Sequence, residues 1–374
     1  MTQIALNFSE ALIEQPPTLS PLKASVQALA LDRQRPSDSC EARSWDPMGF
    51  EIGWDYARHR LTPSPDHLHL GHPVRQGWQA GCATFGTRTL RPTRHVAQWL
   101  QLRLQAWLRG RVFEAFMVTP RFLAQLDVAQ CPVTREGLAG AQEGVIVTLC
   151  DRAGVAAGHL AMLGRRAAAA LERGSLDRAD LHPDLSAEQL CRLQSLRQLV
   201  TPMSHAQACA SPLTVLPPAR VRVLNPVHAL QTVLTRLFVG GAYARRMADL
   251  GACLPARARR PYALLMSTLL ARRLDAGAAA DPTQVRHALE DAWAHPLVLR
   301  RWAPLAQSLS RADCDRLVQK AVQRGWAGAS VRWLDEAQST EGWSLQTPGP
   351  RQDAVTPIAS PAPRACEGAY QAQS

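Results

Sequence analysis

The clearest hydrophobic periodicity in the chain lies in the segment 93–109. Its apolar residues recur at the three- and four-residue spacing of one helix face: Val96, Trp99, Leu100, Leu104, Trp107 and Leu108. This spacing is typical of an amphipathic helix that buries one face. Thr93 stands at the N-cap position, and Gly110 directly follows the segment, where a helix commonly ends. We therefore predict a helix here, with Trp99 and Trp107 in the core.

Helix-start signals recur between residues 186 and 337. Two of them place a capping residue before a proline at the first helical position: Asn225-Pro226 and Asp281-Pro282. Pro261 is predicted to open a further helix that ends at Gly277, and Ser310 with Asp313 resembles a capping box. Short helices joined by turns that contain proline or glycine predict an orthogonal helical bundle.

A different pattern occupies residues 131–171. The β-branched run 145–148 predicts a strand, Gly154 and Gly158 predict a loop, and the following alanine-rich stretch predicts a helix that starts near Gly158. This order predicts a β-hairpin packed on a helix. The apolar run 112–118 also looks like a strand.

The same patterns divide the chain into four regions. Residues 1–47 and 338–374 are rich in proline and polar residues with little periodicity, so we expect a mobile arm and a disordered tail. Between them we predict a basic α+β domain over 48–173 and a helical domain over 186–337. The fold class is therefore mainly α with a small α+β segment, in which an orthogonal bundle follows a ββα-like module.

Charge adds an indication of function. The formal net charge is +11 and the pI is about 9.7, which favours polyanionic partners, nucleic acid first. From Arg58 to Arg121, the only carboxylates among many arginines are Asp66 and Glu114. We expect a phosphate-binding surface made by the following arginines: Arg58, Arg60, Arg75, Arg88, Arg91, Arg94, Arg103, Arg109 and Arg111.

Two motifs carry a resemblance to a known family: Cys131-Pro132-Val133-Thr134 and the loop Gly154-Val155-Ala156-Ala157-Gly158-His159-Leu160. Over residues 131–171 the chain resembles the phage and mobile-element type of HNH endonuclease, a ββα-metal fold. The resemblance implies metal-binding or proton-transferring side chains at three positions, where this sequence has Val147, His159 and Ala168. Valine and alanine can neither ligate a metal nor move a proton, so the resemblance implies a degenerate, inactive module.

Other interpretations stay open at this point. Asp151 and His159 would be the catalytic residues of a rearranged nuclease site, and only that alternative calls for a divalent metal as cofactor. An ordinary hairpin and helix would explain the same residues without chemistry. A protein-interaction scaffold that contacts a partner through the helical domain is the third possibility. His67, His69 and His72 offer imidazoles for a metal, but their spacing in a loop that contains prolines favours a solvated loop.

The composition of the chain indicates in which cellular compartment the protein is expected. No apolar run is long enough to cross a bilayer, and the N-terminus lacks the basic region of a signal peptide. The nine cysteines are scattered and form no Cys-x-x-Cys pair, so reduced thiols are expected. We therefore expect a cytoplasmic, nucleic-acid-associated protein without a membrane partner, and leave open whether it is an enzyme.

Overall fold

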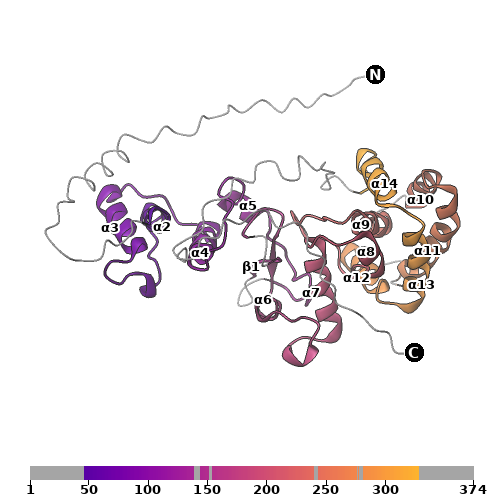
Figure 1. Ribbon diagram of the computed structural model, residues 1–374, viewed down its shortest axis with the longest axis horizontal. Coiled ribbons are helices and arrows are strands. Elements are labelled where there is room, and N and C mark those ends of the chain that lie inside the picture. Colours follow the sequence, from indigo (N-terminus) through magenta and orange to yellow (C-terminus); the bar gives the residue numbers. More distant parts are fainter. Residues whose placement is uncertain are drawn as a thin grey trace, which may run out of the picture. The chain divides into compact units, whose positions relative to one another are not determined.

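The computed structural model describes residues 46–138, 144–150, 154–239, 243–275, 277 and 281–327. These residues form mostly helices together with a two-stranded antiparallel sheet, as Figure 1 shows. The predicted fold class, mainly α with a small α+β segment, is therefore confirmed. The predicted disordered tail, and all but the last two residues of the predicted arm, lie outside the described residues.

Three helices form the first described part of the chain: α2 (Pro47–Arg58), α3 (Pro73–Phe85) and α4 (Arg94–Leu108). The Asp46 carboxylate caps α2 by accepting a hydrogen bond from the Gly49 N–H at 3.0 Å. The predicted helix over 93–109 is confirmed as α4, with the Thr93 hydroxyl accepting from the Val96 N–H. Trp107 is buried as predicted, and Trp99 is partly buried beside it.

Helices α2 and α3 pack backbone against backbone. A Cβ atom placed on Gly53 would lie 1.9 Å from the Val74 carbonyl oxygen, and one on Gly77 would lie 1.9 Å from the Phe50 carbonyl oxygen. Only glycine leaves room for this approach, because any other residue carries a Cβ. The two helices therefore sit closer than side chains normally allow.

The short helix α5 (Pro120–Ala124) precedes the sheet, in which β1 (Val145–Thr148) pairs with β2 (Leu160–Leu163) in antiparallel register. Helix α6 (Arg165–Arg173) follows β2, so an antiparallel pair of strands followed by a helix is observed, as the predicted β-hairpin and helix require. The predicted helix start near Gly158 is wrong. Gly158 has a φ of 91° and turns the chain into a strand whose four residues are all buried. A short apolar run buried on both faces carries no periodicity that separates strand from helix.

The strand predicted over 112–118 is also wrong. Within that run the backbone forms isolated bridges at Phe113 and Glu114, of which Phe113 pairs with Val155, and no strand is described. The Val155 N–H donates to the Val112 carbonyl and the Glu114 N–H donates to the Val155 carbonyl, at 2.8 and 2.9 Å. Residues 112–114 thus brace the glycine loop instead of entering the sheet.

After α6, the regular elements of the described chain are all helices: η3 (Ala179–Leu181), α7 (Ala187–Leu199), α8 (His205–Ala210), α9 (Pro226–Val239), α10 (Tyr243–Ala252), α11 (Ala256–Asp275), α12 (Pro282–Ala292), α13 (Pro296–Gln307) and α14 (Arg311–Gln323). Asp281 and Ser310 form the predicted N-caps, each within a capping box. The predicted helix start at Pro261 is wrong, since α11 begins at Ala256 and carries this proline inside it. One large apolar cluster joins α8 through α14.

Candidate functional site

The glycine loop over residues 154–160 lies in the protein interior. All residues from Gly154 to Leu160 are buried. The Glu114 side chain, 0 % exposed, accepts a hydrogen bond from the Ala157 N–H at 2.7 Å, and the Arg222 N–H donates to the Gly158 carbonyl at 3.0 Å. The loop is therefore braced from two sides by segments distant in sequence.

His159 is only 4 % exposed in this loop. Burial, and after it the positive charge of Arg222, lower the pKa of its imidazole to about 4. Burial also raises the pKa of the Glu114 carboxyl. The imidazole is thus neutral over most of the physiological range and faces protein instead of solvent, which suits a core residue better than a general base.

The other members of the predicted nuclease site do not join His159 in a described cluster. Asp151 lies outside the described residues. Val147 and Ala168 are buried in an apolar cluster with Leu163. Among the residues that the structure describes, no group of three or more His, Cys, Asp or Glu side chains is arranged to hold a metal ion.

The three loop histidines do come together. The ring centroid of His72 lies 5.4 Å from that of His67 and 4.7 Å from that of His69. Their nitrogen atoms are used locally, because His72 Nδ1 accepts from the Val74 N–H and caps α3, while His69 Nδ1 bonds the Asp66 carbonyl. The cluster therefore stabilises the turn into α3.

Arg103 departs from the other predicted phosphate-binding arginines. Its side chain is buried, 5 % exposed, and donates to the Asp55 carboxylate at 2.6 Å and to the Glu51 carboxylate at 3.2 Å. The reason is its position on the apolar face of α4, three residues after Leu100. Arg103 thus ties α4 to α2, and its charge is already neutralised.

The remaining predicted arginines lie near or at the surface. Arg75 and Arg111 are half-buried, and the others are exposed: Arg58, Arg60, Arg88, Arg91, Arg94 and Arg109. Within the described part of the chain, no carboxylate forms an ion pair with any of these six exposed arginines.

One backbone hydrogen bond gathers several of them. The Leu90 N–H donates to the Arg58 carbonyl at 2.8 Å, so the segment that carries Arg88 and Arg91 runs beside the end of α2. The Trp54 and Phe85 rings meet edge to face nearby, with centroids 5.0 Å apart, and fix the ends of α2 and α3 together. Two separate segments that carry arginines are thereby held next to each other.

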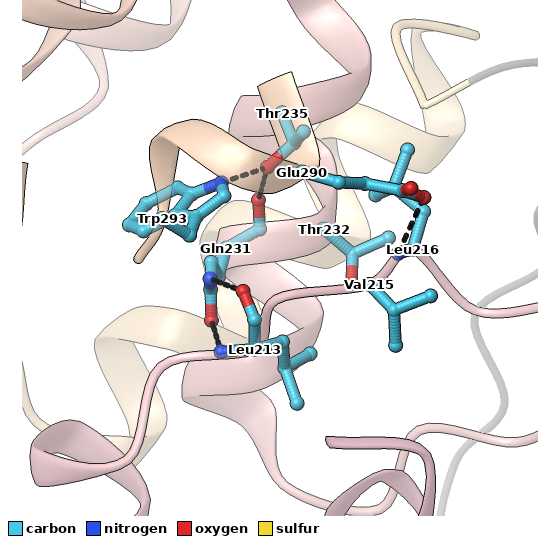
Figure 2. Close-up of a pocket in the computed structure, with 8 residues that line it drawn as sticks. All are labelled: Leu213, Val215, Leu216, Gln231, Thr232, Thr235, Glu290 and Trp293. Carbon is cyan, nitrogen blue, oxygen red and sulfur yellow. Dashed lines mark hydrogen bonds between the residues drawn. The ribbon is translucent and has the colours of Figure 1, made fainter. Parts of the chain in front are cut away.

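A small polar cavity lies in the helical part of the chain, shown in Figure 2. The Gln231 side chain of α9 pairs with both backbone groups of Leu213, accepting from its N–H and donating to its carbonyl at 2.8 Å each. Glu290 of α12 accepts from the Leu216 N–H at 3.0 Å, and the Trp293 indole donates to Thr235. The cavity volume of about 10 Å³ has room for one water molecule. The hydrogen bonds of Gln231 and Glu290 to Leu213 and Leu216 latch the segment 213–216 to the bundle.

Replacing Gln231 by leucine is expected to destabilise this latch. The substitution leaves the buried Leu213 N–H and carbonyl without partners, and each such group costs about 1–3 kcal/mol. We expect a loss of about 2 kcal/mol or more in the free energy of unfolding, measured by urea denaturation. Gln194→Leu is the matched control because its amide bonds a single carbonyl, that of Leu176, and it is half-buried. An equal loss in both variants would contradict the latch.

Arg135 joins the turn before the sheet to the helical bundle. It donates to both oxygens of Asp291, at 2.8 and 2.7 Å, and to the His287 carbonyl at 3.3 Å. Its backbone φ is 61°, an uncommon conformation for a residue with a side chain. The sequence offered one signal for this contact, an arginine directly after the Cys-Pro-Val-Thr motif, but its partners lie more than 150 residues away.

Comparisons with protein families, with curated proteins and with solved structures found no match. No helix within the described ranges has the length and apolar content needed to cross a membrane.

Proposed function

We propose that this protein associates with nucleic acid through the exposed arginines near the ends of α2 and α3. The observation that carries the proposal is the backbone hydrogen bond from the Leu90 N–H to the Arg58 carbonyl, because it brings the segment that carries Arg88 and Arg91 beside the end of α2. Arginine without a protein carboxylate is available for phosphate, which it contacts through a planar, bidentate fork. The net charge of +11 adds long-range attraction to a polyanion.

Binding without cleavage is the role that the geometry favours. The His159 imidazole, which the nuclease alternative requires as a site residue, is buried in a loop covered by Glu114 and Arg222. A phosphodiester would have to reach that imidazole through the protein interior.

We also propose a cytoplasmic location, which the seven free cysteines of the described chain support.

Salt-dependent binding tests the proposal. Fluorescence anisotropy with labelled duplex DNA and single-stranded RNA is expected to show affinity that falls steeply with salt, by a slope of about 0.9 per phosphate contact for duplex DNA. The triple variant Arg58→Gln, Arg88→Gln, Arg91→Gln is expected to weaken binding about tenfold or more at low salt and to flatten that slope.

The matched control removes the same charge elsewhere. Arg300, Arg301 and Arg311 are exposed on α13 and α14, and replacing all three by glutamine is expected to change binding much less. Equal losses in the two triple variants would show that net charge alone acts. Absent binding would contradict the proposed function, and Mn²⁺-dependent cleavage on a gel of the same samples would contradict a binding-only role.

A further inference from the structure

A second group of arginines lines a pocket in the helical part of the chain. The pocket has a volume of about 250 Å³ and lies among α9, α10, α12 and the turn after α14. Among the described residues, three arginines line it, Arg236, Arg246 and Arg286, together with the apolar residues Leu216, Val239, Trp326 and Ala327. Arginines from three different helices thus line one small volume.

The three arginines differ in how many hydrogen-bond acceptors their guanidinium groups have. Arg286 donates its Nε–H to Glu290 at 2.9 Å and a terminal N–H to the Leu216 carbonyl at 3.4 Å. Arg236 and Arg246 form no side-chain hydrogen bond or ion pair within the described residues, and the Arg236 Nε–H is buried without an acceptor there. Among the described residues, these three guanidinium groups and the Glu290 carboxylate sum to a charge of about +2.

This arrangement is costly for the protein by itself. All three arginines are half-buried, and a partly desolvated charge without a partner destabilises a fold, to which a second charge of the same sign adds. Burial, and then the proximity of Arg286, lower the pKa of the Arg236 guanidinium, which agrees with that environment. An anion of charge −2 in the pocket would remove both costs.

We propose that this arginine pocket binds a small phosphate or diphosphate anion. Two guanidinium forks without protein acceptors suit the oxygen geometry of phosphate, and the local charge matches a dianion. A pocket of about 250 Å³ is smaller than those that hold drug-sized ligands, which favours one or two phosphate groups over a whole nucleotide. The site lies outside the α2–α3 region, so it does not depend on the proposed nucleic-acid binding.

Calorimetric titration with inorganic pyrophosphate at constant ionic strength tests the proposal, with inorganic phosphate as a second probe. The full chain is expected to bind pyrophosphate and to melt at a higher temperature in its presence. Arg236→Met and Arg246→Gln are each expected to weaken this binding about 10- to 100-fold, as loss of a charge-assisted hydrogen bond implies. Arg300→Gln removes one exposed charge on α13 and is expected to leave binding unchanged.

A second measurement keeps the test decisive. Because the Arg236 Nε–H has no acceptor among the described residues, Arg236→Met is expected to raise the melting temperature without pyrophosphate, whereas loss of an ordinary structural arginine would lower it. Absence of pyrophosphate binding by the full chain, or equal binding by all three variants, would overturn the proposal. Duplex DNA binding measured on the same variants is expected to stay as in the parent protein, which separates this site from the proposed function.

Discussion

Gly77→Ala and Gly53→Ala are each expected to destabilise the protein by about 3 kcal/mol or more, because the added Cβ would meet a backbone oxygen. An alanine Cβ would lie 1.9 Å from the Phe50 carbonyl oxygen in the first variant and 1.9 Å from that of Val74 in the second, far inside van der Waals distance. Backbone cannot move aside as the tip of a flexible side chain can. Helices α2 and α3 would therefore have to separate along their contact, which also strains the ion pairs that Arg103 makes with α2.

The sign of the effect makes this a stringent test. Alanine stabilises an isolated helix by about 1 kcal/mol relative to glycine, so a helix without the close contact would gain stability from either substitution. Urea denaturation followed by far-UV circular dichroism measures the change. Gly137→Ala is the matched control, since nothing lies within 4 Å of its Cβ position, and we expect a change within about 0.5 kcal/mol. Stabilisation by Gly53→Ala would show that the helices are not in backbone contact.

The helices of this protein are predictable where the local sequence decides them. Thr93, Asp281 and Ser310 cap the helices that their residue types and spacing predict, because a cap depends only on residues within one turn. Pro261 is a misleading signal, since it lies inside α11 although proline usually marks a first turn. The close packing of α2 on α3 has a sequence signal in glycines spaced by four, Gly49 with Gly53 and Gly77 with Gly81.

The candidate sites depend on contacts that no local pattern contains. Nothing near Arg103 in the sequence shows that Asp55 and Glu51 neutralise it from another helix. Three arginines from separate helices, Arg236, Arg246 and Arg286, meet at one pocket only because the bundle brings them together. The glycine loop around His159 is recognisable in the sequence as unusual. Its burial, however, comes from Glu114 and Arg222, which belong to segments far from it along the chain.

Acid is expected to destabilise the fold through His159. Its pKa falls from 6.5 in the unfolded chain to about 4 in the folded protein, mainly because burial disfavours the charged imidazole. Between these pH values the unfolded state binds a proton that the folded state does not, so the stability present above pH 6.5 is lost as the pH falls towards 4. That pKa difference corresponds to roughly 3 kcal/mol.

The variant His159→Gln isolates this contribution. The difference in unfolding free energy between the variant and the parent protein is expected to be constant above about pH 7 and to shift by roughly 3 kcal/mol in favour of the variant by about pH 4. Glu114 acts in the opposite direction. Because its pKa is raised in the folded protein, the stability that it contributes is lost as the pH rises above the ordinary pKa of a glutamate. Glu114 is present in both proteins, so its effect cancels in the difference. A difference that does not vary with pH would mean that the imidazole is accessible to protons in the folded state. That result would reopen the rearranged nuclease site, because a general base must reach solvent or substrate.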